Sequence, residues 1–271
     1  KPRYEAVLNI DLPFYMIFNN LKKSLRTKIR SAESNGVRVY KGDFDSLKYL
    51  YFQTKRKYPR DLKFFEEMYK EYSKNKAIEF YYTKLDTKIY LERTKQLYEE
   101  YEIKSQKISN EIIRLAAQGK DTLHHINKKI QYDAMFEKYN SQLVYATKLL
   151  SENPEGIITS SVLVIKNYDT VYLVMDGYDT RYKSLNSKHL LLWKIIEKYS
   201  KLGYKKFNFG GVTNIDIENN KYAGLNEFKL SFNPIINEYI GDLEIITNNT
   251  LYFMYRNSRP FIKAIMSKES K

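Results

Sequence analysis

The chain has 271 residues, which suffices for one large domain or for one domain with an appendage. Its formal net charge of +14 favours polyanionic partners, such as nucleic acid, anionic membrane surfaces or phosphorylated substrates, without choosing among them. The absence of cysteine excludes disulfides, thiolate zinc sites and thioester chemistry, and the sequence contains no apolar run of about 18 residues that would predict a transmembrane helix.

The first part of the chain alternates between β-rich runs and amphipathic runs. We expect strands at 4–10, 37–43 and 77–85, and helices at 13–35, 45–58 and 60–75. The second half of the first helix carries a basic stripe, because Lys22, Arg26 and Arg30 follow one another at i, i+4 spacing. We expect this stripe to bind an anion, and a solvated helix face is the alternative.

Residues 88–152 change character and form a long polar segment of helical period with no proline. Apolar residues near heptad spacing run through it on both sides of a break at 116–121. They are Leu91, Tyr98, Tyr101, Ile108, Ile112, Leu115, Leu123, Ile126, Ile130, Phe136, Tyr139, Leu143 and Leu149. We predict an antiparallel, coiled-coil-like helical hairpin that protrudes as an arm from a domain made of 1–87 and 153–271. Two ordinary helices packed on the core are the alternative.

The C-terminal part returns to strands. The runs 156–167 and 170–177 predict a hairpin, 187–203 a helix, 204–211 a strand ended by two glycines, 236–246 a further strand, and 250–266 a closing helix. The stretch "LNEFKLSF" is either a helical turn or a strand. This order is typical of an α/β (α+β) acyltransferase domain with a mixed, GNAT-like sheet and an inserted arm.

Lys229 is the most informative single residue, because Phe228 and Leu230 flank it and Phe232 follows. Such a lysine is either a solvated charge on a strand edge or a cation held in an aromatic slot.

Five stretches, in this order, resemble the Fem family, whose members transfer amino acids from aminoacyl-tRNA to build peptidoglycan interpeptide bridges. They are "RSAESNGVRV", "YPRDLKFFEEMY", "KLGYKKFNFGGV", "YAGLNEFKLSF" and "NEYIGDLEI". The resemblance covers the chain from Lys1 to about residue 265, and the arm lies where family members insert one. Family members usually have two acyltransferase-like subdomains. This chain corresponds to the second one plus the arm, so we expect the first to lie upstream of Lys1.

The resemblance implies a reaction and its partners. An amine of a peptidoglycan precursor attacks the aminoacyl ester on tRNA, and the precursor is UDP-MurNAc-pentapeptide or its lipid-linked form. No cofactor, metal ion or acetyl-coenzyme A is expected. The implied location is the cytoplasm, at the inner face of the membrane, and assembly as a homodimer or heterodimer is compatible with this activity.

The resemblance also implies site residues. Lys229 and Phe228 match the family's catalytically important Phe-Lys pair, in which the lysine supplies positive charge to the oxyanion of the transition state. Arg60 matches the arginine that grips the substrate's phosphates, and its guanidinium is expected beside the Lys229 ammonium. Gly210 and Gly211 match the pair that opens the loop before the Phe-Lys segment. For such a transferase, the anion expected at Lys22, Arg26 and Arg30 is the tRNA.

Two positions depart from the family pattern. Phe64 stands where a tyrosine is usual, which keeps an aromatic wall but loses its hydroxyl. A second substrate-facing tyrosine is expected at Val174, and Tyr172 lies two residues before it. Both departures bear on whether this chain binds the same precursor.

Three other functions compete with the transferase. A non-catalytic module for tRNA or other nucleic acid would use the charge and the tyrosines, although the basic residues are spread over several elements. A coiled-coil interaction module would use the arm. An acetyl-coenzyme A N-acetyltransferase would need a Gly-rich pyrophosphate loop that opens a helix, and no such loop is found.

Overall fold

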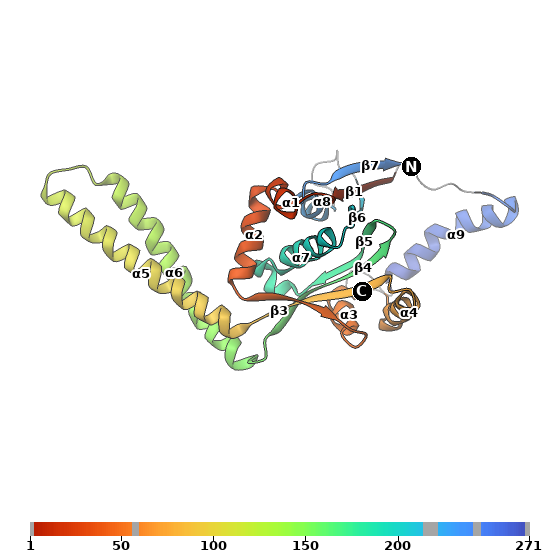
Figure 1. Cartoon of the computed structure of the whole chain (residues 1–271), viewed down its shortest axis with the longest axis horizontal. Helices are drawn as coiled ribbons and strands as arrows, with labels where there is room; N and C mark the ends of the chain where they lie inside the picture. The colour runs from red at the N-terminus through yellow and green to blue at the C-terminus, as the bar shows by residue number, and fades with distance from the viewer. Residues whose placement is uncertain (1–2, 56–59, 214–221, 241–244, 269–271) are drawn as a thin grey trace.

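The computed structural model describes residues 3–55, 60–213, 222–240 and 245–268. A single mixed sheet of seven strands, in the order β2-β3-β4-β5-β6-β1-β7, organises these residues (Figure 1). The strands are β1 (Arg3–Asn9), β2 (Val37–Gly42), β3 (Ile78–Leu85), β4 (Ile157–Asn167), β5 (Thr170–Tyr178), β6 (Lys206–Val212) and β7 (Ile235–Tyr239). β5 and β6 run parallel, and the other neighbouring strands pair antiparallel. The expectation of an α/β fold with a mixed sheet is therefore confirmed, and the narrower GNAT-like assignment is compatible with it.

Helices cover both faces of this sheet. The helices of the described residues, including those that extend away from the sheet, are α1 (Phe14–Asn20), α2 (Lys23–Ser34), α3 (Leu47–Thr54), α4 (Leu62–Ser73), α5 (Thr87–Ala117), α6 (Leu123–Glu152), the 3-10 helix η1 (Thr180–Leu185), α7 (Ser187–Lys201), α8 (Ala223–Leu230) and α9 (Asn249–Lys268). Asp61 and Asp86 cap α4 and α5, because their carboxylates accept hydrogen bonds from backbone N–H groups in the first turn. No helix in the described part of the chain is long and apolar enough to cross a membrane.

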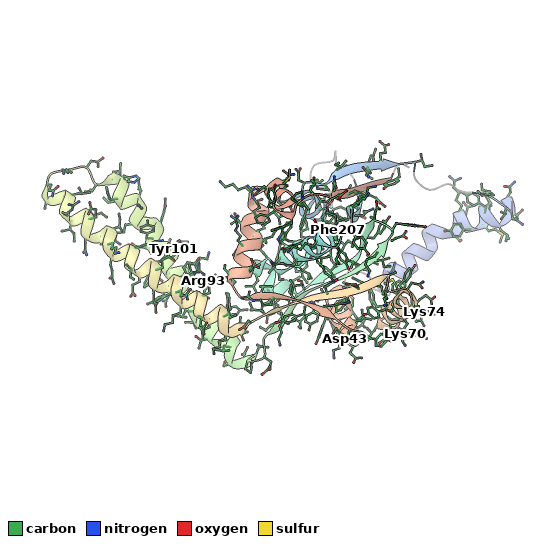
Figure 2. The ribbon with its side chains drawn as sticks, in the orientation of Figure 1. Asp43, Lys70, Lys74, Arg93, Tyr101 and Phe207 are labelled. Carbon is green, nitrogen blue, oxygen red and sulfur yellow. The ribbon has the colours of Figure 1, made fainter. Side chains whose placement is uncertain are left out.

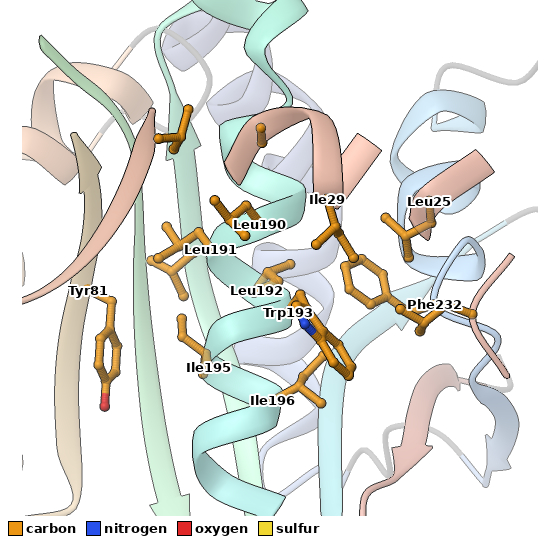
Figure 3. Packing of buried hydrophobic residues seen from close by; sticks show 14 of the residues in the cluster. Leu25, Ile29, Tyr81, Leu190, Leu191, Leu192, Trp193, Ile195, Ile196 and Phe232 are labelled. Carbon is orange, nitrogen blue, oxygen red and sulfur yellow. The ribbon is translucent and has the colours of Figure 1, made fainter. Parts of the chain in front are cut away.

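The alternation of side chains along the central strands creates two hydrophobic clusters on opposite faces. Val162 and Val164 of β4 belong to the larger cluster with α2 and α7, whereas Leu163 between them belongs to the smaller cluster with α3 and α4. Figure 1 shows α1, α2 and α7 on one side of the sheet and α3 and α4 on the other. In Figure 3 the apolar side of α7 meets Leu25 and Ile29 of α2.

The predicted helical hairpin is present as α5 and α6, which pack antiparallel and extend away from the sheet (Figure 1). Aromatic rings join the two helices: the centroids of Tyr98 and Phe136 lie 4.9 Å apart, and those of Tyr101 and Tyr139 lie 5.5 Å apart (Tyr101 is labelled in Figure 2). The expected apolar seam does not continue to the tip, because Leu123 and Ile130 are exposed. The assignment of the hairpin as a separate domain stays a prediction.

The single helix predicted at 13–35 is wrong, because the chain breaks between α1 and α2. Leu21 and Lys22 adopt extended backbone conformations, and the Lys22 N–H donates to the Ser231 carbonyl beyond α8. Arg26 then donates from its guanidinium to the Asn19 carbonyl at the end of α1, at 2.7 Å. Amphipathic periodicity runs through such a break, because both short helices bury the same side.

Candidate active site at the gap between β5 and β6

The parallel strands β5 and β6 pair over only three residues and then separate. Their last pair is Tyr172 with Asn208, although β5 continues to Tyr178 and β6 to Val212. Each strand bulges just beyond this point. On β5 the extra residue is Val174, because Val164 pairs with Leu173 and Leu163 with Met175. On β6 Phe209 and Gly210 together oppose Ala6 of β1. Two bulges at one strand separation leave a gap in the sheet and re-aim the side chains that follow it.

The bulge on β6 requires Gly210. Its φ of +75° lies in the left-handed region, which glycine adopts without steric cost. The Gly210 N–H donates to the side-chain oxygen of Asn208, whose amide in turn donates to Glu5, each at 2.7 Å. The expectation that the glycine pair ends the strand is wrong by one residue, because β6 extends to Val212.

The Lys229 ammonium lies at this gap. Its Nζ donates to the Gly211 carbonyl oxygen at 2.7 Å, and a Cβ on Gly210 would lie 4.0 Å both from Nζ and from the Leu173 carbonyl oxygen of β5. The residue is only 7% exposed and lies in the last turn of α8. "LNEFKLSF" is thus helical where α8 ends at Leu230, and Lys229 is not a solvated charge on a strand edge.

Aromatic rings and a second lysine surround Phe228 beside this ammonium. The Lys188 ammonium lies 3.7 Å from the centroid of the Phe228 ring, and the His189 ring packs edge-on against the same ring at 5.0 Å. Lys188 also forms an ion pair with Asp176 of β5 at 3.0 Å. The β5 bulge makes this pair possible, since it turns Asp176 to the face of the sheet that α7 covers.

Burial lowers the pKa of Lys229 from its ordinary value, and the nearby Lys188 lowers it further, while Asp176 and Glu5 act in the opposite direction. Burial also lowers the pKa of His189, to about 4, and the positive charges of Lys28 and Lys188 add to that effect. His189 is therefore neutral near pH 7, which leaves the lysines as the cations of this region.

Asn226 shares the inner side of α8 with Lys229, because the two residues have i, i+3 spacing. Its amide group donates to the Thr213 carbonyl at 2.6 Å, just as Lys229 donates to Gly211 two residues earlier. Its buried side-chain oxygen has no hydrogen-bond partner within the described residues. These two bonds fix α8 against the end of β6 and hold the ammonium in place.

Arg60 and Phe64 lie together, but not beside Lys229. The guanidinium carbon of Arg60 lies 4.4 Å from the centroid of the Phe64 ring, and both residues are exposed. Phe65 of the same helix, α4, belongs to the cluster with α3, whereas Phe228 and Phe232 pack on the cluster with α7. The expectation of adjacent charges is therefore wrong: the elements that carry Arg60 and Lys229 pack on opposite faces of the sheet.

Tyr172 belongs to β5. It is 39% exposed and belongs to the last residue pair before the gap. Its neighbours Val171 and Leu173 contact the α7 cluster, so the Tyr172 side chain is on the α3 and α4 face. Val174, where the family pattern expects a tyrosine, is the bulged residue and is also exposed.

The basic stripe of α2 is only partly available to a ligand. Arg26 is engaged with the Asn19 carbonyl, and the Arg30 guanidinium carbon lies 5.3 Å from the centroid of the Phe18 ring. Lys22 is exposed at the start of α2. Among the described residues, no group of three or more His, Cys, Asp or Glu side chains is placed to hold a metal ion.

Sequence reasoning missed Asp176, Lys188 and Asn226. Aspartate is unfavourable inside a β-strand, so Asp176 within "VYLVMDG" was a usable signal. The pairing of Asp176 with Lys188 depends on a bulge that no periodicity in the sequence reveals.

The comparisons with known proteins agree with this fold. The lipid II:glycine glycyltransferases of Staphylococcus epidermidis and Staphylococcus saprophyticus are 23% and 24% identical to the chain over its whole length. The chain spans about 65% of the length of these curated relatives. A crystal structure of FemX superposes with a TM-score of 0.67 at 22% identity, over 93% of this chain and 63% of that one, which shows a common fold. Residues 1–258 match the FemAB family, so the predicted membership is confirmed and the chain belongs to the FemAB family.

Proposed function

We propose that this chain carries the transfer site of an aminoacyltransferase that moves an amino acid from aminoacyl-tRNA to an amine of a peptidoglycan precursor. The observation that carries the proposal is the Lys229 ammonium, which is buried, hydrogen-bonded to Gly211 and located at a gap in the sheet. The relatives are named as glycyltransferases that act on lipid II, so glycine and a lipid-linked precursor are the first substrates to test.

The chemistry needs a fixed positive charge. The amine nitrogen attacks the ester carbonyl and forms the new C–N bond. The ester C–O bond then breaks, and the proton that the amine loses reaches the departing ribose oxygen. Negative charge develops on the carbonyl oxygen in between, and a preorganised cation near that oxygen lowers the barrier. Lys229 is preorganised because its position does not depend on a substrate.

The two faces of the sheet give each substrate its own approach. Arg60 and Phe64 offer a guanidinium and a ring on the α4 face, which suits the phosphates of the acceptor precursor. Lys229 approaches the gap from the α8 side. We propose that the acceptor approaches from the α4 face, the aminoacyl ester from the α8 side, and that they meet between β5 and β6. Action at the inner face of the membrane follows if the acceptor is lipid-linked.

The experiment is a transfer assay with purified full-length protein, radiolabelled glycyl-tRNA and two acceptors, lipid II and the soluble UDP-linked pentapeptide. A glycyl-precursor with the label in a new amide bond is the expected product. Salt-sensitive binding of tRNA with neither acceptor modified, for glycine and for a mixture of the other aminoacyl-tRNAs, would contradict a transferase and favour the non-catalytic module.

A further inference from the structure

A second candidate site lies away from Lys229, between the edge strand β2 and helix α7. A pocket of about 370 Å³ opens there, with Val37 and Val39 of β2 and Leu190 of α7 as its apolar wall. Its volume is at the lower end of the range of about 300 to 1,000 Å³ that small-molecule sites occupy. Lys188 contacts Phe228 beside Lys229, whereas Lys198 lines this pocket. Both lysines belong to α7, where a spacing of ten residues corresponds to about 15 Å along the helix axis.

The rim of the pocket is positively charged. Arg38 and Lys41 contribute from β2, and Lys194 and Lys198 contribute from α7. The carboxylates nearby are shared: Glu79 contacts Lys41, Lys166 and Lys198, and Glu197 contacts both Lys194 and Lys201. Glu33 forms an ion pair with Lys194, which Glu197 also contacts. Cations thus outnumber carboxylates around the pocket, and such a surplus at a concave surface attracts an anion.

A part-buried network of hydrogen bonds holds the side chains beneath the pocket in one arrangement. Glu79 accepts hydrogen bonds from Tyr81, Lys198, Lys166 and Tyr199. Burial alone would raise the pKa of Glu79, but the hydrogen bonds from Tyr81, Lys198 and Lys166 hold it well below its usual range. The carboxylate therefore stays charged and fixes Lys198, while Arg38 and Lys41 at the rim are exposed.

The combination of an apolar wall with a cationic rim fits an anion that carries a compact apolar group. A second hollow of about 420 Å³ shares Lys194 and Lys198 with the pocket and adds Lys201 and Leu202, so the basic surface continues along α7. We infer that this pocket binds one nucleotide, with the base or sugar on the aliphatic wall and the phosphate on Lys41 and Lys194. A nucleotide within an RNA strand and a free nucleotide share this chemistry. The continuation toward Lys201 favours the strand, whose next phosphate it would receive. This site does not require transferase activity.

The test is equilibrium binding of a fluorescently labelled single-stranded RNA of about ten nucleotides, with adenosine monophosphate and inorganic phosphate as competitors. Lys41→Gln with Lys194→Gln removes rim charge. The control is Lys63→Gln with Lys74→Gln, because Lys63 of α4 and Lys74 at its C-terminal cap have the same charge and also pair with glutamates. Val39→Phe fills the pocket without changing charge and keeps a residue that strands favour. Thermal unfolding shows whether each variant is folded.

We expect the rim variant to weaken RNA binding about tenfold and to flatten the dependence of affinity on salt by about 0.7 in slope, the contribution of one phosphate contact on a single strand. Val39→Phe is expected to weaken binding comparably, and the α4 control to change it less than twofold. Adenosine monophosphate should compete better than inorganic phosphate. If calorimetry shows that Val39→Phe loses adenosine monophosphate, while labelled RNA binds unchanged and is not displaced by that nucleotide, the site takes a free nucleotide.

A folded Val39→Phe variant that binds both RNA and adenosine monophosphate like the wild type would overturn the inference. Equal competition by inorganic phosphate and adenosine monophosphate would also overturn it, because the apolar wall would then contribute nothing. Lys229→Ala is expected to bind RNA normally in this assay. Failure of the pocket and failure of the proposed transfer chemistry are therefore separate results.

Discussion

Lys229 and Arg60 are both cations next to phenylalanine, yet they differ in burial and in hydrogen bonding. Lys229 is withdrawn from water and hydrogen-bonded to a backbone carbonyl, whereas Arg60 is exposed and lies over the exposed Phe64 ring. Burying a charged group costs free energy that the fold must offset, so a buried cation at a gap in a sheet is a candidate for a chemical role. An exposed arginine costs little and gains order only when a ligand arrives. The comparison therefore predicts a chemical role for Lys229 and a binding role for Arg60.

The largest effect is expected from Lys229→Met, which keeps most of the side-chain volume and removes the charge. We predict that kcat/KM for aminoacyl transfer falls by about 10² to 10³, the usual loss for one stabilising group at an oxyanion. Thermal stability should change little, since removal of a buried charge offsets the loss of the hydrogen bond to the Gly211 carbonyl. Steady-state kinetics and calorimetry measure both quantities, and a variant that loses activity only because it unfolds would contradict the assignment.

The next effect is the pH dependence of stability that the buried, neutral His189 causes. Because the pKa of His189 is lowered to about 4, the folded protein binds fewer protons than the unfolded chain between that pH and about 6.5. The stability of the wild type should therefore fall as the pH drops through this window, by about 3 kcal/mol at most from this residue. His189→Gln should remove that part of the pH dependence. Urea unfolding of both proteins at several pH values tests this, and parallel curves would refute it.

Arg60 should affect binding more than chemistry. We predict that Arg60→Ala weakens a diphosphate-bearing precursor about tenfold or more, the range of one charge-assisted contact, with little change in kcat. The matched gain-of-function variant is Phe64→Tyr, which restores the hydroxyl usual at this position and should tighten binding several-fold. Calorimetry measures both affinities. Unchanged affinity in Arg60→Ala would remove the distinction between the two cations.

The smallest effect is expected on the α2 stripe. Arg30 is exposed over Phe18, so Arg30→Gln should reduce the salt dependence of tRNA binding by no more than about 0.7 in slope. Arg26→Gln is a different experiment, because it removes the hydrogen bond to Asn19 and should lower thermal stability as well. If both variants change the salt dependence of tRNA binding and the thermal stability equally, Arg26 contributes only its charge, and the structural role of its hydrogen bond is refuted.

Much of this fold could be predicted from local patterns, and the site could be predicted only in part. The β4–β5 hairpin, helix α7 and the α5–α6 hairpin follow from hydrophobic period and turn residues, and the structure has all of them. Lys229 and Gly210 were found because an aromatic neighbourhood and a glycine pair are visible in sequence. The Asp176–Lys188 pair and the separation of Arg60 from Lys229 depend on bulges and on which face each helix covers, and neither is a local property.

Chemical rescue is the most direct test of the central claim that a fixed ammonium at the β5–β6 gap promotes transfer. In Lys229→Ala the missing group is a primary ammonium, and methylammonium or ethylammonium can replace it in the space left behind. The account predicts that these cations restore formation of the aminoacyl-precursor in a saturable manner, while tetramethylammonium and sodium at equal ionic strength do not. Full activity of Lys229→Ala without any added amine would contradict it.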